Sequence, residues 1–317
     1  MRAARYYGKE DIRVEEVEVD PCGDGQVRVA PSYVGICGTD LHEFLGGPTF
    51  APVTPHPLSR ESIPITLGHE FSGVVSEKGG FIGLSGGGGG LSDSVVVPQG
   101  SVLSLPEQIP LEIGALVEPL SVAWHAVSAA ALLPESTVLV LGGGPIGLAV
   151  VQCLVALKTK KIIMSEVSKT RQRFAKEFGA HHVLDPKTYD LVAISRELSG
   201  QGGPDVVFDC AGVPASLVTA CRAVKPRGTV VNVAIWEREV PFQPNMLVFK
   251  EAHYTAVLGY QREDFQAVID HLANGTLKPD KMITSTISLD DVVEGGIKAL
   301  IKDKESHVKI LVKVGGP

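Results

Sequence analysis

The sequence predicts an α/β protein of two domains, one β-rich and one built on a doubly wound parallel sheet. The chain has 317 residues, more than one typical domain, and 44% of them are hydrophobic against 21% charged. Up to about residue 120, short alternating apolar runs are broken by glycine and proline, which is typical of strands. Beyond that point strand-like and helix-like segments alternate, as in a parallel sheet with crossover helices.

The β-rich domain is predicted from the runs IRVEEVEV, GQVRVAPSYVG, FSGVV and DSVVVP. A closing run, HVKILVKV, also has the composition of a strand, and we expect it to return to this first domain. The predicted boundaries are therefore residues 1–120 and 260–317 for the β-rich domain, and 121–259 for the parallel-sheet domain.

The parallel sheet is predicted to contain six strands, with helical segments between the earlier ones, such as Pro145–Lys158 and Lys169–Phe178. After Leu258 we expect two further helical segments before the closing strand. The six strands are Val138–Leu141, Lys161–Ser165, His182–Leu184, Asp205–Asp209, Thr229–Val233 and Tyr254–Leu258.

Charge and cysteine usage exclude several classes of protein. The net charge of −7 and the isoelectric point near 5.7 disfavour nucleic-acid or anionic-membrane partners, which select basic surfaces. The N-terminus lacks an apolar signal-peptide core, and no uncharged apolar run has the length of a membrane span. The five cysteines are scattered and form no C-x-x-C pair, which fits a reducing, cytoplasmic location.

A dinucleotide-binding turn is predicted in STVLVLGGGPIGLAVVQCLVAL. Gly142, Gly144 and Gly147 follow the order G-x-G-x-x-G between an apolar strand and a helix, with Pro145 and Ile146 inside the turn. The first glycine makes the tight turn, the second admits the pyrophosphate and the third allows helix and strand to pack closely. The helix N-terminus then offers free N–H groups to the phosphates. A glycine-rich turn in another α/β fold is the alternative.

The second strand of the same unit, KIIMSE, ends at Glu166, where a carboxylate is expected to bind the adenosine ribose hydroxyls. Its charge would repel a 2′-phosphate, which favours NAD over NADP. Lys169 and Arg171 lie nearby and could offset that repulsion, and Arg171 is a candidate cofactor-binding residue.

Four side chains of the types that zinc accepts lie in or next to the first domain: Cys37, His69, Glu70 and Glu118. Three of them have an ordinary alternative when considered singly. Cys37 could be a small buried apolar residue, His69 a hydrogen-bonded core histidine and Glu118 a carboxylate at a helix start. Beside a nicotinamide-binding fold, the combination favours a catalytic metal site.

The motifs GICGTDLH, LGHEFSG, VEPLSVAWHAV and GGGPIG occur here in the order found in one family. The chain resembles the medium-chain, zinc-dependent alcohol and polyol dehydrogenases over nearly its whole length, most of all the branch of 2,3-butanediol and sorbitol dehydrogenases. The resemblance implies a GroES-like catalytic domain, a Rossmann domain and an active site in the cleft between them. It also implies a small-molecule alcohol or ketone substrate, and a homodimer or homotetramer.

The resemblance implies a role for each candidate in the first domain. Cys37 and His69 match zinc ligands, Glu70 matches a carboxylate that ligates or swings in to ligate the zinc, and Glu118 matches a residue that binds the zinc or its water. In this family zinc lowers the pKa of the bound alcohol, which then gives its hydride to the nicotinamide.

Two further residues match the proton path of the family. Thr39 matches the hydroxyl that contacts the substrate oxygen, and His42 matches the histidine at the outer end of the relay. With Glu70, they are the predicted catalytic residues.

One departure from the family concerns a lobe of several tens of residues that relatives carry after the strand corresponding to FSGVV. It holds four closely spaced cysteines for a structural zinc in many members, but here FSGVVSEKGG leads directly to FIGLSGGGGGLSDSVVVP. No cysteine lies in this stretch, so one catalytic and no structural zinc is expected. The glycine run Gly86–Gly90 is expected to form a loop rather than a phosphate-binding turn.

Two explanations of the missing lobe stay open: a true deletion or splicing difference, and residues of the protein that are absent from the sequence as written. An intact mass clearly above 33.5 kDa would support the second.

The function predicted is NAD-dependent and zinc-dependent oxidation of a secondary alcohol or vicinal diol, such as 2,3-butanediol or a polyol. A zinc-free quinone or enone reductase of the same fold is one alternative. A nicotinamide-binding protein that has lost catalysis is the other, favoured only by the missing lobe.

Overall fold

The computed structural model describes residues 1–57, 60–78, 88–200, 202–236, 238–303 and 305–315. The chain forms two compact units. Unit 1 comprises Met1–Glu118 and Met282–Pro317, and unit 2 comprises Pro119–Lys281. Part of the junction SEKGG and the first two glycines of the run Gly86–Gly90 lie outside the described residues.

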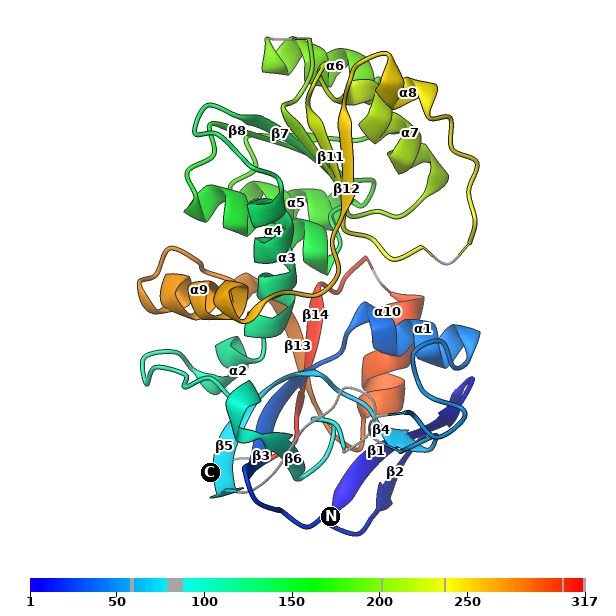
Figure 1. The fold of residues 1–317 in the computed structure, drawn as a ribbon, viewed down its shortest axis with the longest axis vertical. Coiled ribbons are helices and arrows are strands. Elements are labelled where there is room, and N and C mark those ends of the chain that lie inside the picture. The colour runs from blue at the N-terminus through cyan, green and yellow to red at the C-terminus, as the bar shows by residue number, and fades with distance from the viewer. Residues whose placement is uncertain (58–59, 79–87, 201, 237, 304, 316–317) are drawn as a thin grey trace. The chain divides into compact units, whose positions relative to one another are not determined.

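Unit 1 is built on two sheets (Figure 1). The smaller sheet has the order β2-β1-β4, and the larger one has the order β13-β14-β3-β5, with β6 also pairing with β3. The strands are β1 (Arg2–Gly8), β2 (Asp11–Glu16), β3 (Gln26–Gly35), β4 (Ile65–Thr66), β5 (Glu70–Lys78), β6 (Val95–Pro98), β13 (Ile283–Ser288) and β14 (Lys309–Lys313).

The core of unit 1 joins both ends of the chain. Val34 of β3 packs with buried residues of β1 and β14, such as Tyr6 and Ile310. β14 pairs antiparallel with β3, so that Val312 faces Val34. The closing run HVKILVKV thus contributes a strand to the larger sheet of unit 1.

The helical segments of unit 1 are short. A seven-residue π-helix follows β13, and π-helical segments are rare in proteins. The segments are α1 (Gly38–Gly46), the 3₁₀ turn η1 (Gln99–Ser101), α2 (Leu111–Gly114), the π-helix η3 (Val292–Lys298) and α10 (Ala299–Lys302). Helix α3 (Val117–Ala129) begins at the end of unit 1 and continues in unit 2.

Unit 2 contains a parallel six-stranded sheet in the order β12-β11-β10-β7-β8-β9, the doubly wound order of a dinucleotide-binding fold. Its four central strands, β7, β8, β10 and β11, are largely buried, as expected when helices cover both faces, whereas the edge strand β12 is mostly exposed. The strands are β7 (Thr137–Leu141), β8 (Lys161–Ser165), β9 (His182–Leu184), β10 (Val206–Asp209), β11 (Thr229–Asn232) and β12 (His253–Ala256).

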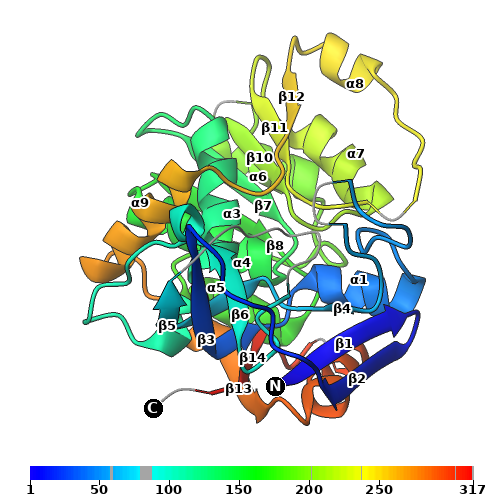
Figure 2. The same cartoon turned by 60° about the horizontal axis from the view of Figure 1, so that its bottom comes forward.

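Helices lie on both faces of this sheet (Figures 1 and 2), and helix α4 follows the glycine motif directly. The helices are α4 (Pro145–Ala156), α5 (Lys169–Glu177), α6 (Leu191–Ser199), α7 (Pro214–Ala223), α8 (Asn245–Val248), α9 (Arg262–Ala273) and the 3₁₀ turn η2 (Asp280–Met282). The predicted α/β class and the six predicted strands are confirmed, with strand ends that differ by at most two residues.

Two elements differ from the sequence prediction. Strand β13, with the sequence ITSTIS, was not predicted, because it is half-exposed and acquires its strand conformation by pairing in parallel with β14.

The unit boundary falls at residue 282 rather than near 260. Helix α9 belongs to unit 2 because Asp264 pairs with His125 at 2.8 Å and the His271 ring packs on Trp124 at 4.5 Å.

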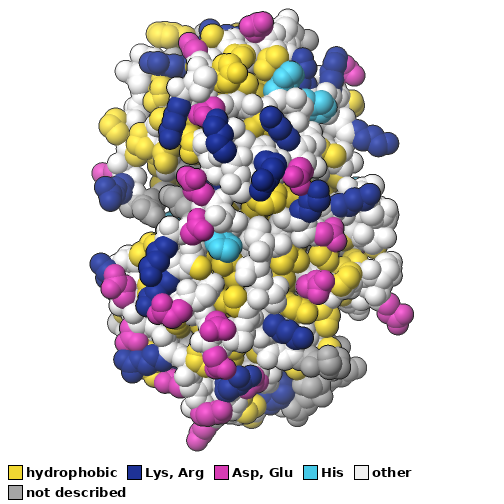
Figure 3. Space-filling model, turned by 180° about the vertical axis from the view of Figure 1, so that it is seen from behind, with side chains coloured by type: hydrophobic (Ala, Val, Ile, Leu, Met, Phe, Trp, Pro, Cys, Tyr) yellow, Lys and Arg dark blue, Asp and Glu magenta, His cyan; other side chains and the backbone are white. Residues whose placement is uncertain are grey.

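No helix in the described part of the chain is both long and apolar enough to cross a membrane. Acidic and basic side chains are interspersed on the face of the molecule shown in Figure 3.

Candidate active site

The candidate metal site begins where strand β3 ends. Cys37 lies at the N-terminus of α1, and the buried Asp40 carboxylate accepts a hydrogen bond from the Cys37 N–H at 2.9 Å. The Cys37 thiol lies 3.6 Å from the Thr39 hydroxyl. Helix α1 also carries His42, which is partly buried. Because a helix N-terminus favours negative charge, this position suits a thiolate.

Three of the four predicted metal ligands come together. Cys37 from the start of α1 meets His69 and Glu70 from the start of β5, and one ligand atom of each lies within 4.8 Å of the others. Strands β3 and β5 pair antiparallel with Gly35 opposite Glu70, which brings both ligand segments to the same end of the sheet. A tetrahedral zinc with ligands at about 2.0–2.3 Å requires such a spacing, so this donor set fits zinc.

Glu70 is held in a buried ion pair that the sequence did not reveal. Lys309 Nζ on β14 lies 2.8 and 2.6 Å from the two carboxylate oxygens of Glu70 and donates to the Ile36 carbonyl at 3.2 Å. Only 1% of Glu70 and 2% of Lys309 is exposed. A Cβ at Gly35 would lie 2.1 Å from Glu70 Oε2, so the absence of a side chain there makes room for the carboxylate.

The negatively charged groups of the site stabilise the protonated forms of His69 and Lys309. Burial by itself lowers the pKa of His69, but a hydrogen bond to Cys37 and the charges of Asp40, Cys37 and Glu70 raise it to about 10. Burial likewise works against the charged form of Lys309, yet Glu70 and Cys37 hold the pKa of Lys309 above its ordinary value. A site that favours these cations through its negative groups is equally suited to a metal cation.

Glu118 belongs to the same neighbourhood but not to the group of three. Burial and the negative charge of Glu70 raise the pKa of Glu118 to about 7, while His69 and Lys309 oppose that change. The pKa of Glu118 is therefore influenced by the charges of the candidate metal site. In the described part of the chain, however, its carboxylate is not one of the three clustered ligand groups.

The glycine motif forms the predicted turn between β7 and α4. Gly142 has a φ of +93°, and a Cβ at Gly147 would lie 1.9 Å from the Gly142 carbonyl oxygen. Gly144 has open space at its Cβ position and stands directly before α4, whose first residues are Pro145 and Ile146. The turn thus leaves space before a helix N-terminus, where a phosphate binds favourably.

Glu166 lies at the end of β8 beside this turn. Its carboxylate accepts hydrogen bonds from the Gly143 N–H at 2.5 Å and the Ser168 N–H at 2.7 Å, and only 6% of the residue is exposed. The carboxylate therefore fixes the glycine turn to the start of α5. Arg171, partly buried in the first turn of α5, lies three residues beyond Ser168, whose hydroxyl accepts its N–H.

Asp209 was not singled out from the sequence. It is fully buried at the end of β10 and accepts hydrogen bonds from the N–H groups of Ala211 and Gly212 and from the Ser216 hydroxyl. Ala211, whose N–H binds Asp209, lies against the glycine turn, since a Cβ at Gly142 would lie 2.9 Å from the Ala211 Cβ. Asp209 therefore holds in place a residue that borders this turn. β7 and β10 are neighbours at the switch point of the sheet, where cofactors bind in such folds. The signal that could have found Asp209 was an acidic residue ending an otherwise apolar strand.

Comparison with known proteins shows to which family of proteins this chain belongs. Residues 23–84 match the alcohol dehydrogenase GroES-like domain, and residues 145–274 match the zinc-binding dehydrogenases. The (R,R)-butanediol dehydrogenase of Bacillus subtilis (strain 168) is 41% identical over 347 aligned positions, which cover 99% of both chains. The chain belongs to the medium-chain zinc-binding dehydrogenases and is a zinc-dependent, nicotinamide-dependent alcohol or diol dehydrogenase.

Within that family, several relatives that align over nearly their whole length are named (R,R)-butanediol dehydrogenase. The (R,R)-butanediol dehydrogenase of Saccharomyces cerevisiae is 34% identical over 98% of both chains. The crystal structure of 2R,3R-butanediol dehydrogenase from Bacillus subtilis superposes with a TM-score of 0.93 at 40% identity, covering 98% of this chain and 99% of the other. The resemblance predicted from the motifs is confirmed.

A Gly147→Ala variant tests the cofactor turn. We expect at least about a tenfold weaker binding of NADH, because the added Cβ meets the Gly142 carbonyl oxygen and pushes the helix away from the turn. The measurement is NADH fluorescence titration. Gly144→Ala is the comparison variant, because its Cβ enters open space. Any loss of NADH affinity in Gly144→Ala therefore comes from contact between the new methyl group and the cofactor. Unchanged NADH affinity in both variants would contradict the assignment of this turn.

Proposed function

We propose that this protein catalyses the NAD-dependent oxidation of a vicinal diol, 2,3-butanediol or a close analogue, and the reverse reduction of the hydroxyketone. The observation that carries the proposal is the convergence of Cys37, His69 and Glu70 within 4.8 Å of one another. The naming of full-length relatives as (R,R)-butanediol dehydrogenases supports the choice of substrate.

In this proposal Cys37 and His69 hold the zinc through the thiolate and a ring nitrogen. Glu70 stands within reach as a third ligand. Glu118, whose pKa responds to the charges of Glu70 and His69, is proposed to act on the zinc or its water. Bound zinc supplies Lewis-acid stabilisation of the alkoxide oxygen. The buried Lys309 competes for the Glu70 carboxylate, so the strength of that ion pair sets how readily Glu70 is released to the metal.

Thr39 and His42 are proposed to carry the proton of the alcohol. Thr39 is next to Cys37, with its hydroxyl 3.6 Å from Cys37 Sγ, and would be placed to contact the substrate oxygen. His42 lies one helical turn further along α1, on the same side as Thr39. Its imidazole could accept the proton and pass it to solvent.

NAD is proposed as the cofactor in preference to NADP because of Glu166. Its buried carboxylate, tied to the Gly143 N–H, would face the adenosine ribose and repel a 2′-phosphate. The position of Arg171 at the start of α5 makes it a candidate contact to the same part of the cofactor.

We propose one catalytic zinc and no structural zinc. The alignment with the Bacillus subtilis relative spans 347 positions, whereas this chain has 317 residues, so at least 30 aligned positions have no residue here. A shorter connection after FSGVV is consistent with that difference.

Self-association is proposed through the edge strand β12, with a second copy as the partner. Among the described strands β12 ends the six-stranded sheet at one side, and a sheet edge invites pairing with another strand. Exposed apolar side chains flank it, among them Phe249 (84% exposed) and Leu258 (79%). Two copies of this edge, related by a twofold axis, would bury these side chains and continue the sheet.

A double variant, Phe249→Glu with Leu258→Glu, is expected to reduce the particle to one chain in light scattering, because four like charges would face one another across the twofold axis. Leu133→Glu, at a leucine of similar exposure (71%), is the matched control and should leave the assembly unchanged. Dissociation in the control alone, or in neither variant, would refute this interface.

The function itself is tested by metal analysis together with NAD and NADP reduction over a panel of diols, polyols and simple alcohols. One zinc per chain, with turnover highest on a 2,3-diol and with NAD, would support the proposal. Cofactor binding without zinc and without turnover would favour the non-catalytic alternative. Zinc-free reduction of quinones or enones would favour the reductase alternative.

A further inference from the structure

The described part of the glycine run lies against the segment that carries His69 and Glu70. The Gly90 N–H donates to the Gly68 carbonyl at 2.7 Å, and the Leu91 N–H donates to the Leu67 carbonyl at 3.0 Å. On its other side the Leu91 carbonyl accepts a hydrogen bond from the Ala4 N–H on β1 at 2.8 Å. Residues 88–91 are therefore packed between β1 and the ligand segment.

This close approach leaves no space for side chains. A Cβ at Gly89 would lie 2.3 Å from the Leu67 carbonyl oxygen and 2.5 Å from that of Thr66. A Cβ at Gly90 would lie 2.7 to 2.9 Å from the ring and Cβ of Phe71, the residue after Glu70. Real Cβ atoms do not approach other heavy atoms so closely, so a side chain at Gly89 displaces the backbone of Thr66 and Leu67, and one at Gly90 displaces the Phe71 side chain.

The ligand segment shows the complementary feature. Gly68, directly before His69, has a φ of +97°, and a Cβ there would lie 2.7 Å from the Leu91 backbone nitrogen. Glycines on both segments thus allow two backbones to touch, which requires the absence of side chains on each.

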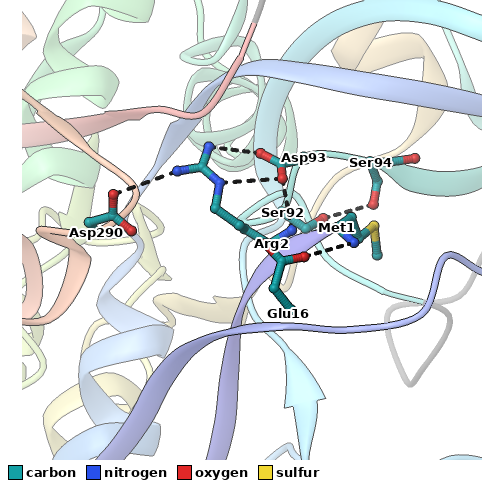
Figure 4. A network of polar contacts seen from close by, with 7 residues as sticks. All are labelled: Met1, Arg2, Glu16, Ser92, Asp93, Ser94 and Asp290. Atoms are coloured by element: carbon teal, nitrogen blue, oxygen red, sulfur yellow. Dashed lines mark hydrogen bonds and ion pairs between the residues drawn. The ribbon is translucent and has the colours of Figure 1, made fainter.

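The far end of the glycine segment is anchored by polar contacts (Figure 4). Arg2 donates two hydrogen bonds to the Asp93 carboxylate, the Arg2 N–H donates a third at 2.7 Å, and the guanidinium also pairs with Asp290 at 3.6 Å. The Asp93 N–H donates back to the Arg2 carbonyl at 3.0 Å. The segment is therefore hydrogen-bonded on both sides and fixed at its end.

We propose that Gly89 and Gly90 are positioning residues for the metal site, acting by holding the backbone of residues 66–71 so that His69 and Glu70 stay directed toward Cys37. The inference rests on the proposed function only in that zinc is the ion whose retention is measured. It assigns to Gly89 and Gly90 the role of supporting the segment that carries His69 and Glu70, in a chain whose connection after FSGVV is short.

The test compares zinc retention in Gly90→Ala with that in Gly100→Ala, whose Cβ enters open space. Purified zinc-loaded protein is mixed with a chromogenic chelator, and the release rate is recorded. A Co²⁺-substituted sample reports the ligand geometry through its visible spectrum. We expect about tenfold faster zinc release and an altered Co²⁺ spectrum in Gly90→Ala, with Gly100→Ala matching the wild type.

A second variant covers the case in which Gly90→Ala does not fold. Arg2→Gln weakens the anchor at Asp93 without introducing a clash, and it should release zinc several-fold faster than the wild type at nearly unchanged thermal stability. Equal release rates and spectra in Gly90→Ala and Gly100→Ala would overturn the inference. So would an unfolded Gly90→Ala together with an Arg2→Gln variant that releases zinc at the wild-type rate. A wild-type protein that binds no zinc would instead refute the proposed function.

Discussion

Replacing Cys37 by serine is expected to reduce alcohol oxidation by more than about a hundredfold and to release the zinc. The thiolate is the one sulfur ligand of the group formed with His69 and Glu70, and it contributes a charge that balances the cation. Changes to partners outside the ligand set already cost about 10–100-fold in metal affinity or activity, so loss of a ligand costs more.

The measurements are zinc content after dialysis and steady-state diol oxidation, with NADH binding as a check that unit 2 remains intact. Cys22→Ser, at a partly buried cysteine outside the group of three, is the control and should keep both zinc and activity. A Cys37→Ser protein with full activity would exclude the zinc mechanism and favour the zinc-free reductase alternative.

Lys309→Met is expected to destabilise the protein by about 3–5 kcal/mol, because it leaves the carboxylate of Glu70 buried without its partner. Methionine keeps most of the volume of the lysine stem, so the loss comes from the charge and from the hydrogen bond to the Ile36 carbonyl rather than from a cavity.

Urea unfolding of the zinc-depleted protein measures this effect. The double variant Glu70→Gln with Lys309→Met should recover a large part of the lost stability, since neither position then carries a buried charge. Lys313→Met, on the same strand at an exposed position, is the matched control and should change the free energy of unfolding by less than about 0.5 kcal/mol. Equal changes in the free energy of unfolding for Lys309→Met and Lys313→Met would show that the ion pair does not contribute to stability.

The same experiment with zinc bound separates two states of Glu70. If the carboxylate ligates the metal when lysine is absent, zinc itself compensates the charge, and Lys309→Met should cost less in the zinc-loaded protein than in the depleted one. A cost that is the same in both forms would indicate that Glu70 stays away from the metal.

The sequence alone determined the elements whose signals are local. The order of glycines from Gly142 to Gly147 between an apolar strand and a helix predicted the turn between β7 and α4, and alternation of strands and helices predicted the parallel sheet. Cys37, His69 and Glu70 were identified by residue type within motifs. These signals are readable because turn geometry, helix capping and strand burial depend on residues a few positions apart.

Only the tertiary structure decided how the candidate metal site is built. Lys309 is 239 positions from Glu70, and nothing near it in HVKILVKV shows that its ammonium group would be buried against a carboxylate. Gly35 and Gly90 act by having no side chain, a property that has meaning only once the opposing atoms are known. Strand β13 and the place of α9 in unit 2 likewise depended on partners far along the chain. Such features arise from packing between distant segments, which a local pattern does not encode.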